Sequence, residues 1–107
     1  MNPNDIVLVN FPFSDLTQTK LRPAVVVATP GGDNLILCQI TTKKRSIKAY
    51  EVALPRSATQ GDIRFDSNIY VDMLFTLHKN LVQQTIGSVH DQTTQRAITQ
   101  KLRNLFS

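Results

Sequence analysis

The chain has 107 residues, of which 41% are hydrophobic and 19% charged, and its formal net charge is +4. This balance excludes a disordered chain and predicts one folded domain spanning residues 1–107. A single cysteine, Cys38, excludes an intrachain disulfide, and neither a signal-peptide pattern nor an apolar run of membrane-spanning length is found, so we expect a cytoplasmic protein without a membrane partner.

Short apolar runs punctuated by turn residues predict mostly β structure in the first half of the chain. We expect strands at 6–11, 22–28 and 35–42. The second run is almost continuously apolar, which is typical of a strand buried on both faces. A loop is predicted over the polar residues 12–20, and a turn over 29–34, which contain a proline and two glycines.

The second half continues the β pattern and then changes period. Strands are expected at 50–54, 67–72, 74–77 and 85–89, with a polar connector at 56–62. Asp91 is a good helix N-cap, and apolar residues then recur at helical spacing, which predicts a helix over 91–106 with one face packed on the sheet: Ala97, Ile98, Leu102, Leu105 and Phe106. The expected fold is mainly β, a small barrel or sandwich of about seven short strands over 5–89 with a C-terminal α-helix.

A candidate phosphate site lies where two of these strands meet. Arg22 precedes Pro23 at the start of one apolar strand, and Thr41 and Thr42 end the next strand. A guanidinium beside hydroxyl groups at converging strand ends can bind a phosphate and stabilise charge that builds on it. The plainer alternatives are a strand-edge cation paired with an acid such as Asp15, and threonines chosen for their β propensity.

A basic segment follows the threonines directly. Lys43, Lys44, Arg45 and Lys48 fall within six residues that contain no acid. Such a cluster is either a solvated hairpin tip or a surface that follows nucleic-acid phosphates. Its place next to Thr41 and Thr42 favours the second interpretation. The acids are scattered and no Cys/His cluster or HExxH motif is present, so we expect neither a metal site nor a cofactor.

The order and spacing of these segments resemble the MazF/PemK family of bacterial toxins. The matching pieces are Asp-Ile-Val-Leu-Val at 5–9, Leu-Arg-Pro-Ala-Val-Val-Val at 21–27, Gln-Ile-Thr-Thr at 39–42, Tyr-Val-Asp at 70–72, Leu-Phe-Thr-Leu at 74–77 and Ile-Gly at 86–87. The resemblance implies an SH3-like barrel with a C-terminal helix. It also implies a small ribonuclease that acts as a homodimer and is silenced when a cognate antitoxin protein fills its RNA groove.

The resemblance assigns roles to individual residues. Arg22 matches the arginine that contacts the scissile phosphate, and Thr41 matches the position that helps to hold it. Asp72 matches an acid that serves in some members as the base toward the ribose 2′-hydroxyl. Thr42 is a possible supporting residue. The expected RNA-binding cations are Lys20, Lys43, Lys44 and Arg45.

The sequence departs from the family pattern near Asp72. Tyr70 stands where some members carry a second arginine, and Phe75 and His78 replace an arginine and an aspartate. Tyr70 can donate a hydrogen bond or stack on a base, although the plain interpretation is a packed aromatic. His78 can shuttle a proton or be an exposed polar residue. The loop before Arg22 lacks the histidine that some members carry there. Any catalytic contribution from this loop must therefore come from Ser14, Thr17, Thr19 or Lys20.

The resemblance therefore implies a metal-independent endoribonuclease that cleaves single-stranded RNA as the toxin of a toxin–antitoxin system. Two alternatives stay open. One is a toxin of the same fold that acts by binding a protein, as gyrase-poisoning relatives do. The other is an SH3-like RNA- or protein-binding module without catalysis.

Overall fold

The computed structural model describes residues 1–12 and 19–107. Within them, seven strands form one antiparallel sheet in the order β4-β6-β3-β2-β1-β7-β5. The strands are β1 (Asp5–Pro12), β2 (Thr19–Ala28), β3 (Asn34–Thr41), β4 (Glu51–Leu54), β5 (Thr59–Gly61), β6 (Ser67–His78) and β7 (Val82–Val89). The helices are α1 (Gln92–Leu105) and three single 3₁₀ turns, η1 (Lys48–Tyr50), η2 (Arg56–Ala58) and η3 (Lys79–Leu81).

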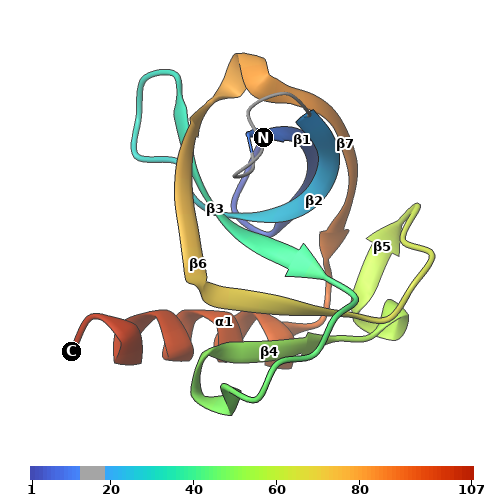
Figure 1. Cartoon of the computed structure of the whole chain (residues 1–107), viewed down its shortest axis with the longest axis vertical. Coiled ribbons are helices and arrows are strands. Elements are labelled where there is room, and N and C mark those ends of the chain that lie inside the picture. Colours follow the sequence, from blue (N-terminus) through green and yellow to red (C-terminus); the bar gives the residue numbers. More distant parts are fainter. Residues whose placement is uncertain (13–18) are drawn as a thin grey trace.

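The sheet curls into a half-barrel, with α1 running beneath it beside β4 (Figure 1). This confirms the predicted fold class, a small mainly β barrel of about seven strands with a C-terminal helix. None of the helices in the described ranges is long and apolar enough to cross a membrane.

Both faces of the central strands are buried, as predicted for 22–28. Ala24, Val25 and Val26 are each fully buried, but they belong to two different clusters because side chains alternate across a strand. Val25 packs in the cluster that includes Ile98 of α1. Ala24 and Val26 pack in a second cluster with apolar residues of β1 and β3. The helix therefore covers one face, and the curl of the sheet closes the other.

Two strand predictions need correction. The strands expected at 67–72 and 74–77 are one strand, β6, whose pairing with β3 shifts register between Gln39↔Tyr70 and Cys38↔Leu74. The break in the sequence pattern is thus a β-bulge within β6 and not the end of a strand.

The connector expected at 56–62 contains the short strand β5, which pairs with β7. Here Gly61 and Gly87 pass so closely that a Cβ on Gly61 would lie 2.4 Å from the Ile86 carbonyl oxygen. Gly61 also has a φ of +104°, a conformation that side-chain-bearing residues rarely adopt. The local sequence does not predict this strand because it is polar, and because its pairing with β7 depends on the close approach of the two glycines.

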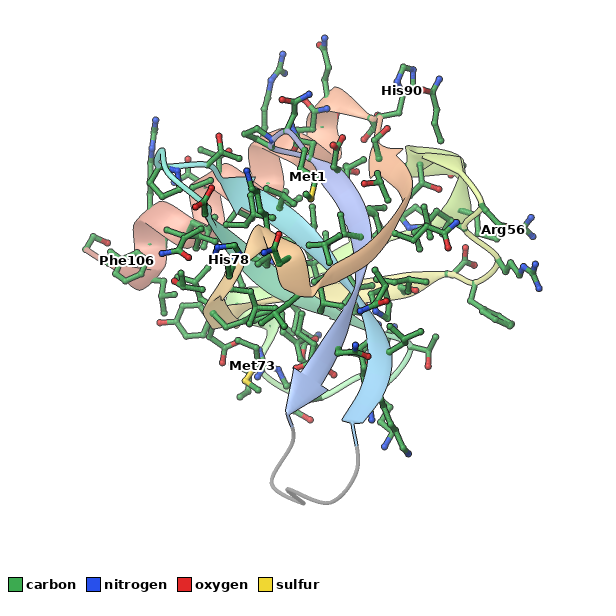
Figure 2. The ribbon with its side chains drawn as sticks, turned by 90° about the horizontal axis from the view of Figure 1, so that it is seen from above. Met1, Arg56, Met73, His78, His90 and Phe106 are labelled. Carbon is green, nitrogen blue, oxygen red and sulfur yellow. The ribbon has the colours of Figure 1, made fainter. Side chains whose placement is uncertain are left out.

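The terminal helix begins as predicted. Asp91 is the N-cap, and its carboxylate accepts hydrogen bonds from the Thr94 backbone N–H at 2.9 Å and from the Thr94 hydroxyl at 2.8 Å. Ala97, Ile98 and Leu102 pack against the core. Phe106 does not, since it is 73% exposed and extends away from the barrel (Figure 2). The predicted apolar face is therefore too long at its C-terminal end, because the last turn of the helix extends beyond the sheet (Figure 1).

The loop predicted over 12–20 is shorter than expected at both ends. Pro12 belongs to β1, and Thr19 and Lys20 belong to β2. The residues between them, which include the predicted Ser14 and Thr17, lie outside the described residues.

Candidate active site

A pocket of about 520 Å³ opens between the start of β2, the end of β3 and the connection from β5 to β6. Its charged lining residues are Lys20, Arg22, Lys43, Asp62 and Arg64, and its hydroxyl-bearing ones are Thr41, Thr42 and Ser67. The remainder of the lining is apolar: Ile6, Leu8, Leu21, Pro23, Ile40, Leu54, Ile63, Phe65 and Ile86. Such a pocket combines an apolar floor with a predominantly cationic rim.

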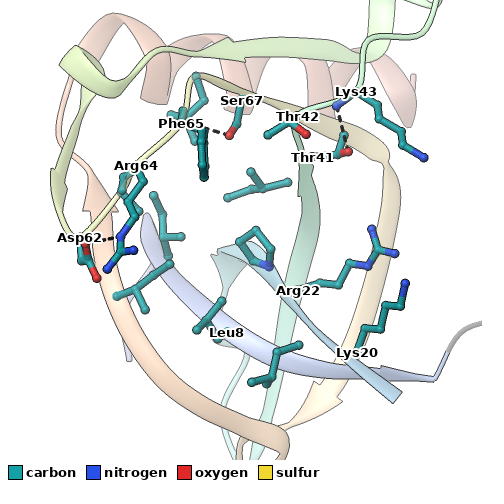
Figure 3. Close-up of a pocket in the computed structure, with 17 residues that line it drawn as sticks. Leu8, Lys20, Arg22, Thr41, Thr42, Lys43, Asp62, Arg64, Phe65 and Ser67 are labelled. Carbon is teal, nitrogen blue, oxygen red and sulfur yellow. Dashed lines mark hydrogen bonds and ion pairs between the residues drawn. The ribbon is translucent and has the colours of Figure 1, made fainter. Parts of the chain in front are cut away.

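The strand register brings Arg22 and Thr41 together. The β2–β3 ladder pairs Ala24 with Gln39. Arg22 lies two residues before Ala24 on β2 and Thr41 two residues after Gln39 on β3, and both residues line the pocket. Arg22 is half-buried, and its side chain lies on the same side of the pocket as that of Lys20 (Figure 3). The two residues that the sequence singled out therefore share one wall of the pocket.

The Thr41 hydroxyl is held in place by the chain that follows it. Its oxygen accepts a hydrogen bond from the Lys43 backbone N–H at 3.2 Å. A hydroxyl that accepts such a bond still carries its own proton, which it can donate to an anion. Thr42 and Lys43 also line the pocket, and Lys20 approaches it from β2 (Figure 3).

Arg45 lies in a different environment from Lys43. Its guanidinium is ion-paired with Glu51 at 3.1 Å and with Asp72, and it lies over the Tyr70 ring with its central carbon 3.9 Å from the ring centroid. The hydrogen bond to Asp72 raises the pKa of Arg45 above its ordinary value, with a smaller contribution from Glu51. We call these four residues, Arg45, Glu51, Tyr70 and Asp72, the arginine clamp.

The predicted base and its neighbour belong to this clamp and not to the pocket lining. Asp72 lies in the bulged part of β6, and its carboxylate accepts the hydrogen bond from Arg45. Tyr70 is buried, and its hydroxyl donates a hydrogen bond to the Lys43 carbonyl oxygen at 2.5 Å. The clamp thus binds the backbone of the basic segment, through the bond from Tyr70 to the Lys43 carbonyl, while the Lys43 side chain lines the pocket.

The remaining predicted residues lie elsewhere. His78 pairs with Asn34, at the opposite end of β3 from Thr41. Seven strand steps separate the two ends, which corresponds to about 23 Å at roughly 3.3 Å per residue. His78 contacts Asp33 at 3.7 Å, and Lys79 pairs with the same carboxylate at 3.1 Å. Lys44 is exposed and does not line the pocket.

Cys38 is a core residue, as its apolar surroundings predicted. It is fully buried, and burial raises the pKa of its thiol to about 12. Thiolate chemistry at this position is therefore disfavoured. No group of three or more His, Cys, Asp or Glu side chains is arranged to hold a metal ion among residues 1–12 and 19–107.

The sequence reasoning missed the wall formed by the connection from β5 to β6. Asp62, Arg64, Phe65 and Ser67 all line the pocket opposite or beside the β2 and β3 residues (Figure 3). The available signal was the Arg64-Phe65 pair, an aromatic beside a cation in an otherwise polar stretch. Its relevance depends on the β5–β7 pairing, which the local sequence does not indicate.

Fold and site together define a class of small protein: an antiparallel half-barrel, covered on one face by its C-terminal helix, with a cation-rimmed pocket where β2 and β3 meet. The model of one family, the PemK-like, MazF-like toxins of type II toxin–antitoxin systems, matches residues 2–106. The chain belongs to this family.

Solved structures have the same fold at low sequence identity. An endoribonuclease from a mycobacterial species, in complex with its cognate antitoxin, has a TM-score of 0.77 at 15% identity, covering 99% of this chain and 94% of its own. The Mycobacterium tuberculosis toxin MazF-mt6 has a TM-score of 0.74 at 20% identity, covering 95% of each chain. MazF in the Deinococcus radiodurans MazE–MazF complex has a TM-score of 0.77 at 17% identity, covering 99% and 95%. A search of curated proteins gave no match.

Proposed function

We propose that this toxin is an endoribonuclease that cleaves single-stranded RNA without a metal ion. The observation that carries the proposal is that Arg22 and Thr41 line the same cation-rimmed pocket. Membership of the toxin family and the fold shared with a mycobacterial endoribonuclease support it.

In the proposed reaction the ribose 2′-oxygen attacks the adjacent phosphorus. The bond to the 5′-oxygen of the next nucleotide breaks, which gives a 2′,3′-cyclic phosphate and a 5′-hydroxyl end. Negative charge grows on the non-bridging oxygens during the attack. Arg22 presents a fork of N–H donors to these oxygens, and the Thr41 hydroxyl adds a further donor whose direction is set by Lys43.

Asp72 has a different part in this proposal from the one that the family resemblance suggests. Its carboxylate binds Arg45 and does not line the pocket. The proposal therefore rests on Arg22 and Thr41, and it gives Asp72 the role of holding Arg45. Tyr70 likewise supports the Lys43 backbone.

The RNA backbone is proposed to follow the cations that line the pocket. Lys20 and Lys43 flank Arg22 and Thr41, and the exposed Lys44 extends the basic surface beyond the pocket. A row of lysines attracts a phosphate chain without selecting its sequence. Arg45 is excluded from this row because two carboxylates already neutralise it.

Two protein partners complete the proposal. The same surface is proposed to bind a cognate antitoxin through an acidic segment, since such a segment complements a cationic pocket electrostatically. Support comes from two structural neighbours that are complexes with their antitoxins. A homodimer and a cytoplasmic location remain proposals taken from the family.

The test is cleavage of a long single-stranded RNA by the purified protein in EDTA. Arg22→Ala is expected to lower kcat/KM by about 10²- to 10³-fold, the effect of removing one donor to a developing oxyanion. Arg103→Ala is the matched control, because it removes the same charge from an exposed position near the end of α1. It should keep full activity.

Other results would redirect the proposal. An intact wild-type protein that binds RNA but never cuts it is a binding module. A protein that stops growth with neither RNA cleavage nor dependence on Arg22 acts on a protein target. Cleavage that disappears in EDTA and returns with added Mg²⁺ would overturn the metal independence alone.

A further inference from the structure

Phe65 is the one aromatic side chain among the described residues that line the pocket. It is 67% exposed, although it lies against an apolar pocket floor, and it belongs to neither core cluster. Figure 3 shows the ring directed into the pocket, between Arg64 and Thr42. Because the ring is largely exposed and lies outside both core clusters, core packing does not explain a large apolar side chain at this position.

The segment that carries Phe65 is fixed at several points. The Asp62 backbone N–H donates to the Ile86 carbonyl at 2.8 Å, and the Ser67 hydroxyl donates to the Phe65 carbonyl at 3.2 Å. Arg56 anchors the same segment twice, through its backbone N–H to Asp66 at 2.9 Å and through its Nε–H to the Ile63 carbonyl at 3.3 Å. The backbone that carries the exposed ring is thus fixed before any ligand binds, which lowers the entropy cost of binding.

Polar groups flank the ring on the same wall. Arg64 donates to Asp62 at 3.4 Å, and both side chains are largely exposed, at 77% and 70%. A guanidinium offers donors and a carboxylate offers acceptors, which are the groups that distinguish one base edge from another. The phosphate-binding pair Arg22 and Thr41 lies elsewhere on the rim of the same pocket (Figure 3).

We propose that Phe65, Arg64 and Asp62 form a nucleobase subsite of this pocket. Phe65 stacks on an unpaired RNA base next to the phosphate held by Arg22, and Arg64 and Asp62 contact the edge of that base. This inference rests on the proposed function for its RNA ligand. RNA is favoured over a protein ligand because four cations and one carboxylate line the pocket that holds the aromatic ring, which suits a base joined to phosphates.

The first test separates base binding from catalysis. Affinity is measured for a short single-stranded oligonucleotide with 2′-O-methyl riboses, which cannot be cleaved, and for an abasic oligomer of the same length. Phe65→Ala is expected to weaken binding of the base-bearing oligomer by about 5- to 100-fold, the range that stacking of one base on an aromatic supports. Binding of the abasic oligomer should stay unchanged.

Two further variants sharpen the result. Phe65→Trp keeps a stacking face and should retain the affinity for the base-bearing oligomer. Phe106→Ala removes an equally exposed phenylalanine from the end of the chain, outside the pocket, and should change neither affinity. Circular dichroism and thermal melting confirm that each variant is folded.

Equal weakening of both oligomers would overturn the subsite, since the ring would then act on the backbone or on the fold. Unchanged binding of both oligomers would also overturn the subsite, and a protein partner would then be the remaining ligand for the ring. If the loss accompanies a shift from dimer to monomer in sedimentation, the ring belongs to a contact between copies. Because none of these readouts needs strand scission, failure of the ribonuclease proposal shows separately, as absent cleavage by the wild-type protein.

Discussion

Arg22 and Arg45 are both half-buried arginines, but the regions around them differ in charge. Arg22 shares its pocket wall with a threonine and stands among lysines. Arg45 is enclosed by Glu51, Asp72 and the Tyr70 ring. Four of the five charged residues that line the pocket are cations, whereas Arg45 is paired with two carboxylates. Two arginines of similar burial therefore lie in different charge environments.

The two regions meet in the basic segment. Lys43 lines the pocket, while its backbone carbonyl accepts the Tyr70 hydroxyl bond. Arg45, two residues later, is held by β4 and β6 through Glu51 and Asp72. Lys101 of α1 adds hydrogen bonds to the carbonyls of Lys48, at 2.9 Å, and of Glu51. The clamp thus fixes the course of the chain from which the pocket lysine projects.

The largest expected effect on stability comes from Arg45→Ala. It leaves Glu51 and Asp72 as neighbouring carboxylates without their cation and removes the cation–π contact. The free energy of unfolding should fall by about 2 kcal/mol, a value reduced from that of a fully buried pair because the side chains are partly exposed. Urea denaturation measures it. An unchanged midpoint would show that the clamp does not stabilise the fold.

Asp72→Asn tests whether this carboxylate holds Arg45 in the clamp or acts as a base in RNA cleavage. We expect stability to fall by about 1 kcal/mol and kcat to fall by less than about tenfold, because the side chain lies outside the pocket lining. Single-turnover cleavage and urea denaturation are measured on the same sample. A loss of about 10²-fold or more in kcat with unchanged stability would instead make Asp72 the general base.

Lys43→Gln should have the opposite profile. Because Lys43 is exposed, the substitution should change the protein's free energy of unfolding by less than about 0.5 kcal/mol. Single-stranded RNA affinity should fall, and the slope of log K against log salt should become shallower by about 0.7, the share of one phosphate contact. Arg45→Ala should leave that slope unaltered. If the slope of log K against log salt were equal for Lys43→Gln and Arg45→Ala, the pocket and the clamp would not differ in their contact with RNA phosphates.

The smallest effect is expected at a carboxylate outside both regions. The hydrogen bonds from Thr94 hold the pKa of Asp91 below its ordinary value. The Asp91 cap therefore stabilises the fold above pH 3.8, the ordinary Asp value, and loses this contribution as the pH falls through the lower folded-state pKa. Asp91→Ala should lower the melting temperature at neutral pH, and the difference should vanish in strong acid. A difference that persists there would assign the effect to helix propensity.

The pocket's principal pair could be predicted because it depends on neighbouring strands. A strong turn signal at 29–34 joins two apolar runs, and antiparallel pairing of such runs brings the start of one beside the end of the other. Arg22 and Thr41 consequently line the same pocket for local reasons. The cap at Asp91 and the periodic helix after it are likewise local features.

The remainder of the site needed the tertiary structure. Arg45 meets Asp72 across 27 residues, and the bulge in β6 sets the register there; a shift by one residue would turn side chains to the other face. Phe65 and Arg64 reach the pocket only because Gly61 and Gly87 allow β5 to approach β7. The sequence by itself determined the fold class, the terminal helix and the Arg22–Thr41 pair, since short-range periodicity and one turn specify them. Only long-range strand pairing decided which cations face the pocket and which are neutralised, because the partner of each charge lies far along the chain.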